Sequence, residues 1–221
     1  MRQPAIDPVL TVFTKPWRTL SLEALADQVA SWGFHGIELP VRPGFQVEPQ
    51  SALEALPRAQ AVFKDRDLEI VSVAGSLDEA TIRACAAADV PVLRVMLKID
   101  ADLGYRASVD AFRATVDHLD PILQETGTVI GLQNHAGPFV GSAVGLMDAI
   151  APLDPARVRA VLDLGHTALA GEPEAMAIDI ASPRMAMVNL KNAEYRLVDE
   201  DADGVKAWAR RWTTARGGLT S

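Results

Sequence analysis

The stretch Val129-Ile130-Gly131-Leu132-Gln133-Asn134-His135 decides the fold, because a short apolar run passes directly into polar side chains. Such a run is too short for a helix and is typical of a parallel strand that is buried on both faces. Similar runs recur along the whole chain, so we expect strands at residues 9–14, 36–39, 70–73, 92–97, 129–133, 159–163 and 185–191.

Helix signals separate these runs. Ser76 and Glu79 have the spacing of a capping box in front of a helix expected at residues 80–88. Another helix is expected at residues 109–126, where Pro121 should kink or split it. Alternating strands and helices imply parallel strands joined by right-handed crossovers. The fold class is therefore α/β, and a (β/α)8 TIM-type barrel accounts for it.

The chain is short for such a barrel, which typically has about 250 residues. The 221 residues are expected to form a single barrel domain, short at its C-terminus and lacking the last strand and helix. Seven strands would leave the first and last with open edges, which favour pairing with another chain. We therefore expect a homo-oligomer through the open barrel edge, or a poorly ordered C-terminus beyond Leu197.

Composition excludes several classes of protein. The chain is 49% hydrophobic and carries a formal net charge of -8, which argues against a nucleic-acid binder that needs a basic surface. Cys85 is the single cysteine, so the chain has neither an internal disulfide nor a cysteine-based zinc pattern. No apolar stretch approaches the length of a membrane span, and no signal peptide opens the sequence. Neither GxGxxG nor a P-loop motif is present. We expect a cytoplasmic protein without a membrane partner.

Polar residues collect where the expected strands end. In a parallel α/β barrel the carboxyl ends of the strands share one rim, where sites are built. The residues at these ends are Glu38, Gln133-Asn134-His135, Asp163-Leu164-Gly165-His166 and Asn189-Leu190-Lys191-Asn192. Strand ends also tolerate polar groups without any function, but the whole set indicates one pocket.

The chain resembles the xylose-isomerase-like TIM barrel family, which includes sugar phosphate isomerases and epimerases as well as endonucleases that act on abasic DNA. The resemblance rests on the segments 33–39 (GFHGIEL), 131–135 (GLQNH), 161–166 (VLDLGH) and 188–192 (VNLKN). It implies one divalent metal held by Glu, Asp, His and Glu from the last four strands. The two glutamates would exchange protons with the sugar through an enediolate.

Three departures from the family pattern affect the implied metal site. Gln133 stands where the first glutamate ligand is expected, Asn189 stands where the histidine is expected, and the eighth strand is absent. The end of the sequence, residues 212–221, resembles the Gly-rich turn before the last helix and strand. Gln133, Asp163 and Asn189 would hold Mn, Mg, Zn or Co only weakly, because hard cations need anionic oxygen or imidazole ligands.

Three residues are the catalytic candidates. Glu38 could accept a proton or bind sugar hydroxyls, and His135 could act as acid or base because imidazole titrates near neutral pH. Lys191 could offset an enediolate, a carboxylate or a phosphate. The alternative for His135 is a hydrogen bond within its loop, and for Lys191 an ordinary surface position. Gln133 cannot serve as a general base.

The substrate-binding candidates lie at the same strand ends. They are Lys15, Trp17, Arg94, Asn134 and His166, and Phe139 could also stack on a sugar. We expect structural roles for His35 and His118, and we expect Cys85 to be a small buried apolar group.

These residues favour a sugar or sugar phosphate isomerase or epimerase that acts on a small polyhydroxylated substrate by proton transfer. The alternative is a non-catalytic sugar-binding barrel with a degraded metal site. A third interpretation, a metal-dependent endonuclease, is disfavoured by four histidines and an acidic surface.

Overall fold

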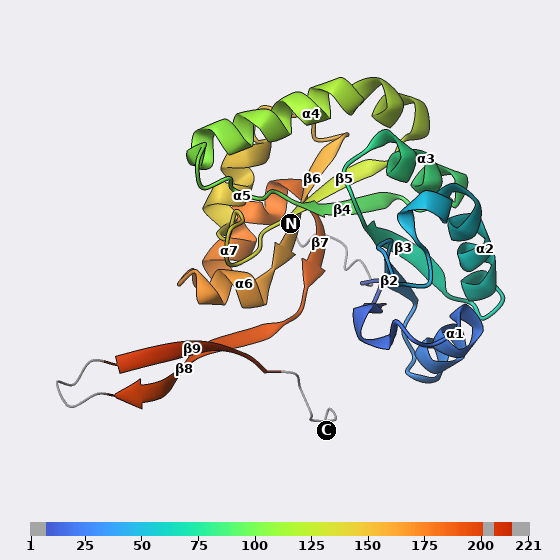
Figure 1. Ribbon diagram of the computed structural model, residues 1–221, viewed down its shortest axis with the longest axis horizontal. Coiled ribbons are helices and arrows are strands. Elements are labelled where there is room, and N and C mark those ends of the chain that lie inside the picture. The colour runs from blue at the N-terminus through green and yellow to red at the C-terminus, as the bar shows by residue number, and fades with distance from the viewer. Residues whose placement is uncertain (1–7, 201–205, 214–221) are drawn as a thin grey trace, which may run out of the picture. The chain divides into compact units, whose positions relative to one another are not determined.

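The computed structural model describes residues 8–200 and 206–213, and their main feature is a seven-stranded parallel sheet (Figure 1). The strands follow one another in the order of the sequence, as in a TIM barrel that stops after its seventh strand. They are β1 (Thr11–Phe13), β2 (Gly36–Pro40), β3 (Glu69–Ala74), β4 (Val92–Met96), β5 (Val129–Gln133), β6 (Val158–Asp163) and β7 (Met185–Asn189). The predicted α/β fold class and all seven strands are confirmed, although β7 ends before Lys191.

The chain divides into two compact units, and each is described by itself. The first comprises Met1–Val95 with Leu119–Ile130, and the second comprises Met96–His118 with Gly131–Ser221. The prediction of a single domain stays a prediction.

In the first unit, three helices pack along one side of β2 and β3 (Figure 1). They are α1 (Leu22–Ser31), α2 (Ala52–Lys64) and α3 (Glu79–Ala87), with short 3-10 turns η1 (Lys15–Trp17) and η2 (Pro49–Ser51). Leu25, Leu56 and Phe63 are fully buried between these helices and the strands. Burial of such side chains contributes about 1.5–3 kcal/mol each to folding.

Two glycines explain how the chain passes from α1 into β2. Gly33 follows the helix at φ +76°, a left-handed conformation that glycine adopts without strain. At Gly36 a Cβ would lie 2.2 Å from the carbonyl oxygen of Glu69, so only glycine lets β2 run this close to β3. Glu38, two residues further on, is placed by this contact.

The cap of α3 differs from the expectation. Asp78, not Ser76, is the N-cap, and its Oδ1 accepts a hydrogen bond from the Thr81 amide at 2.8 Å. The helix therefore starts at Glu79 and ends at Ala87. The Ser76 prediction is wrong because a closer carboxylate competes for the same free amide groups.

Helix α4 (Gly104–Thr126) continues through Pro121, so of the two expected effects of this proline the split is wrong, and the kink stays a prediction. Proline removes one amide donor, and the carbonyl of Asp117 loses that partner, yet the remaining hydrogen bonds keep the segment helical. Gly127 closes it at φ +70° as expected.

The second unit contains helices and a hairpin that the sequence patterns did not predict. Helices α5 (Ala143–Ile150), α6 (Leu164–Leu169) and α7 (Glu174–Ala181) pack together, and a 3-10 turn, η3 (Ser182–Arg184), leads into β7. Strands β8 (Asn192–Glu200) and β9 (Lys206–Thr213) form an antiparallel hairpin that runs out past α6 (Figure 1).

The hairpin includes residues beyond Leu197, where a poorly ordered C-terminus is one of the two outcomes expected from the sequence. Residues 198–200 continue β8, and the Tyr195 hydroxyl donates to the Leu169 carbonyl at 3.2 Å. The segment expected to be a Gly-rich turn, residues 212–221, lies largely outside the described residues. Among the helices described, none is both long and apolar enough to cross a membrane.

Candidate functional site

Asp163 is the centre of a polar cluster in the second unit. It ends β6 and caps α6, so its Oδ1 accepts hydrogen bonds from the amides of Gly165 at 3.1 Å and His166 at 3.3 Å. The residue is 1% exposed. Burial raises the pKa of the Asp163 carboxyl, and the neighbouring Lys191 ammonium opposes this shift only in part.

The second carboxylate oxygen of Asp163 faces hydrogen-bond donors. Gln133 Nε2 donates to Oδ2 at 2.8 Å, and Lys191 Nζ donates to it at 3.4 Å. Gly165 permits this approach, because a Cβ there would lie 3.2 Å from Lys191 Cβ. The Lys191 side chain is 42% exposed, so this partly exposed side chain contacts a buried carboxylate.

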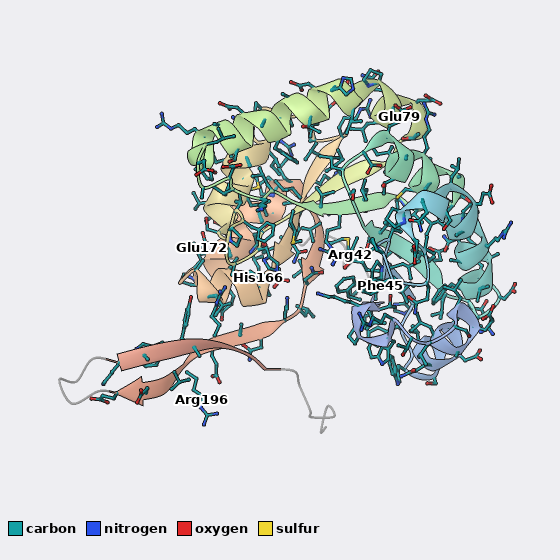
Figure 2. All side chains as sticks on the ribbon, viewed as in Figure 1. Arg42, Phe45, Glu79, His166, Glu172 and Arg196 are labelled. Atoms are coloured by element: carbon teal, nitrogen blue, oxygen red, sulfur yellow. The ribbon has the colours of Figure 1, made fainter. Side chains whose placement is uncertain are left out.

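The His166 ring lies beside this carboxylate, and the His135 ring lies against His166, with the two centroids 3.9 Å apart. His166 Nδ1 accepts a hydrogen bond from the Ala136 amide at 3.1 Å, so the neutral ring carries its proton on Nε2. That nitrogen lies 3.3 Å from Lys191 Nζ and 3.7 Å from Asp163 Oδ2. His166 is 0% exposed, and Figure 2 shows it within the second unit.

His135 has the opposite tautomer. Its Nδ1 lies 2.7 Å from the carbonyl oxygen of Ala136, which can only accept, so Nδ1 carries the proton and Nε2 keeps the lone pair. Phe139 packs edge-on against the ring at 5.0 Å. Ala136 therefore favours a different tautomer in each ring: its amide donates to His166 Nδ1, and its carbonyl accepts from His135 Nδ1.

Asn134 and Asn189 are placed by neighbouring strands. The Asn134 side chain accepts from the Asp163 amide at 2.7 Å and donates to the Asp163 carbonyl at 3.1 Å, so it fixes the strand end that carries the carboxylate. Its predicted substrate contact stays a prediction. Asn189 lies directly opposite Asp163 in the register of β6 and β7 and is half-buried.

The groups around Asp163 do not fit a divalent cation. Its Oδ2 already accepts from an amide NH2 group and an ammonium, and both are donors that repel a metal ion. No group of three or more His, Cys, Asp or Glu side chains in the described part of the chain is placed to hold a metal. The expected Gln133–Asp163–Asn189 metal site therefore disagrees with the donor chemistry of these residues.

A separate cluster lies in the first unit around Glu38. Its Oε1 accepts a 2.6 Å hydrogen bond from Arg94 Nε and a 3.2 Å bond from Ser72 Oγ. The side chains of Arg94 and Glu38 are 5% and 3% exposed, so this is a buried ion pair. The Arg94 guanidinium also stacks over the Phe13 ring at 4.9 Å.

The remaining predicted residues lie as follows. Lys15 is exposed in η1, and Trp17 packs against Trp32 at 5.0 Å, which gives its ring a structural contact. His35 Nδ1 accepts from the Leu10 amide, as its structural interpretation requires. Cys85 is fully buried, and burial raises the pKa of its thiol to about 12.

Sequence reasoning missed Ser72 and Arg42. Ser72 stands in an apolar strand with no motif around it. Arg42 follows β2 in a loop rich in Pro and Gly, and the signal that could have found it is its alternation with Glu38 and Pro40.

The model of the xylose isomerase-like TIM barrel family matches residues 26–210. The chain belongs to this family. None of the curated proteins is similar enough in sequence to serve as a relative.

Solved structures share the fold at low sequence identity. The 3-keto-D-glucoside 4-epimerase of E. coli superposes with a TM-score of 0.69 at 12% identity, covering 82% of this chain and 78% of that one. A D-psicose 3-epimerase of Clostridium cellulolyticum superposes with a TM-score of 0.63 at 14% identity, covering 80% of this chain and 71% of that one. A xylose isomerase domain protein of Planctomyces limnophilus superposes with a TM-score of 0.65 at 12% identity, covering 91% of this chain and 80% of that one. At such identities the likeness shows the fold.

Proposed function

We propose that this family member is a sugar isomerase or epimerase that acts on a small polyhydroxylated carbonyl compound, with an ammonium group in the place of a metal ion. The observation that carries the proposal is the position of Lys191 Nζ, 3.4 Å from Asp163 Oδ2 and 3.3 Å from His166 Nε2. A positive charge fixed beside a buried carboxylate, yet 42% exposed, can meet oxygen atoms of a ligand.

The proposed reaction uses His135 and Lys191. His135 Nε2 takes the proton from the carbon next to the carbonyl, and the C–H electron pair forms a carbon–carbon double bond. The carbonyl oxygen becomes an oxyanion that the Lys191 ammonium stabilises. Delivery of a solvent proton to the same carbon from the other face, while His135 releases its proton to solvent, gives the epimer. Return of a proton to the former carbonyl carbon, with one proton moved between the oxygens, gives the aldose–ketose isomer.

Asp163, Gln133 and His166 act as positioning residues in this proposal. Asp163 holds the ammonium, Gln133 holds Asp163, and His166 directs its Nε2–H toward the same carboxylate. Asn134 fixes the backbone of Asp163 on both its amide and its carbonyl. These contacts reduce the side-chain freedom that a long lysine otherwise loses on binding.

A second candidate function is sugar binding without catalysis. The contacts of Glu38 favour this alternative. Its Oε1 already accepts hydrogen bonds from Arg94 and Ser72, and Glu38 and Arg94 form a buried ion pair. The family's proton-transfer pair of glutamates then has no counterpart in Glu38 or in the amide of Gln133. The carbohydrate would be held by hydrogen bonds alone.

Solvent deuterium incorporation into a panel of ketoses in D2O separates the two functions. The isomerase or epimerase is expected to incorporate deuterium, and Lys191→Met is expected to slow incorporation at least about 100-fold. Lys64→Met is the matched control, since Lys64 also pairs with a carboxylate, Asp89, but on the surface of α2. Binding of a sugar by calorimetry without incorporation supports the binding protein. Incorporation that survives Lys191→Met contradicts the role of the ammonium.

A further inference from the structure

The first unit carries a cluster of positive charge at the carboxyl ends of its strands. The register of the strands places Glu38, Ser72 and Arg94 on one face of the sheet. Phe13 lies opposite Glu38, Glu38 opposite Ser72, Pro40 opposite Ala74, and Ala74 opposite Arg94. Side chains alternate along a strand, so Glu38 and Pro40 share this face. Arg42 lies two residues beyond the end of β2, directly after the bridge between Val41 and Val47.

We propose that Arg42 and Arg94 form an oxyanion site in the first unit, which takes the phosphate or carboxylate group of a small molecule. No anion site is implied by the catalytic proposal above, which rests on the second unit alone. The two proposals therefore stand or fall separately.

The charge balance of the cluster supports this site. Glu38 neutralises one guanidinium through its 2.6 Å bond to Arg94. Arg42 is half-buried and its charge interacts with both members of this pair, so one positive charge is in excess. Burial and the charge of Arg94 lower the pKa of the Arg42 guanidinium, and Glu38 opposes this shift. An excess charge held partly out of water costs free energy, which a bound anion would recover.

The backbone around Arg42 is already ordered for binding. Its amide donates to the Val47 carbonyl at 3.2 Å, and its carbonyl accepts from the Phe45 amide at 3.2 Å. Val41 and Val47 form a bridge, and Gly44 makes the turn at φ +77°. Figure 2 labels Arg42 and Phe45 in this loop. A guanidinium on such a closed loop loses little backbone freedom when it meets a ligand.

The acidic groups in and near the loop have other partners. Glu48, the acid of this loop, accepts from the Gly44 amide at 3.2 Å and from Gln50. Glu38 is turned to Arg94 and Ser72. No ion pair of Arg42 with a carboxylate occurs within the described residues at salt-bridge distance. Guanidinium groups bind phosphate and carboxylate in a two-pronged geometry, which makes both ligands suitable.

Thermal unfolding with inorganic phosphate or acetate, against chloride at equal ionic strength, tests the site on the full chain. Phosphate is expected to raise the melting temperature by about 2–4 °C at saturation. An equal shift with acetate assigns a carboxylate ligand, and a shift with phosphate alone assigns a phosphate ester. Absence of both shifts overturns the proposal, whatever the deuterium experiment gives.

Variants of the arginines assign the effect. Arg42→Gln is expected to abolish the shift and to weaken phosphate binding at least about tenfold by calorimetry. Arg58→Gln removes the same charge from the exposed face of α2 and is expected to leave the shift unchanged. Arg42→Lys keeps the charge but loses the two-pronged geometry, so an intermediate affinity is expected. A full shift in folded Arg42→Gln overturns the proposal.

Without ligand, Arg42→Gln is expected to melt no lower than the wild type, because the repulsion between the two guanidinium groups disappears. The melting temperature without ligand distinguishes two causes of a lost phosphate shift, which are loss of the anion site and loss of a structural contact. If the unliganded variant melts clearly lower, Arg42 is a structural residue and the oxyanion site is overturned.

Discussion

The Asp163 carboxyl is subject to two opposing influences. Burial favours its neutral form, whereas the Lys191 ammonium at 3.4 Å and the amides of Gly165 and His166 favour its charged form. Burial has the larger effect, so the pKa of Asp163 in the folded protein lies above its ordinary value. The Lys191 ammonium therefore lies against a carboxylate that is costly to keep charged.

This balance predicts how stability depends on pH. Because the pKa of Asp163 is higher in the folded state, its titration contributes stability below the ordinary carboxyl pKa, and that contribution is lost as the pH rises through the raised value. Relative to Asp163→Asn, the wild type is expected to lose free energy of unfolding between about pH 4 and the raised pKa. Urea unfolding of both proteins at several pH values measures the difference. A difference that grows in favour of the wild type with rising pH means that Lys191 outweighs burial.

At the residue scale, the sequence located the polar groups but not their partners. His135, Asp163, His166 and Lys191 were recognised because they follow apolar runs, and the structure brings them together. The expected metal required Gln133 to present oxygen. That side chain instead presents its nitrogen to Asp163, a partner 30 residues further along the chain that local sequence does not reveal.

At the scale of single elements, helix starts depend on which side chain reaches the free amide groups first. Ser76 and Asp78 both precede α3, and only Asp78 bonds the Thr81 amide. A carboxylate at a helix N-terminus also interacts favourably with the helix dipole.

Replacement of each residue by alanine tests this assignment. Asp78→Ala is expected to lower the free energy of unfolding by about 1 kcal/mol, because an amide loses its acceptor. Ser76→Ala, two residues away, is expected to change it by less than about 0.5 kcal/mol. Chemical denaturation measures both. Equal losses would mean that the helix is capped through Ser76 as the capping-box pattern predicts.

Strands were easier to predict than the other elements. Buried parallel strands are nearly continuous in hydrophobicity, so each of the seven was recognised. Helix α6 was missed because its six residues begin directly after the strand-end Asp163 and include Gly165, so the segment resembles a loop. The β8–β9 hairpin was missed because Asn192–Glu200 is mostly polar and exposed, and its pairing with Lys206–Thr213 gives no periodic apolar signal.

At the scale of the whole molecule, the sheet has two terminal strands. The strand order begins with β1 and finishes with β7, and within the described residues the other named strands β8 and β9 pair only with each other. Apolar side chains are exposed at both ends of the sheet: Val9 and Leu10 next to β1 are 65% and 49% exposed, and Val188 and Leu190 at β7 are 39% and 81% exposed. Unpaired strand edges with apolar neighbours favour pairing with another chain.

The chain is therefore expected to associate with a second copy through a terminal strand, and the β7 edge can be tested directly. Light scattering after gel filtration should give about twice the 23.7 kDa mass of the chain at high concentration. The double variant Val188→Lys, Leu190→Lys adds charge to this edge and should raise the dissociation constant at least about tenfold. Leu53→Lys is the control, because Leu53 is 57% exposed and belongs to α2 and not to a terminal strand. A wild type that is monomeric at every concentration contradicts association. An unchanged dimer of the double variant moves the contact away from β7, because two lysines on a strand edge oppose the approach of a second strand.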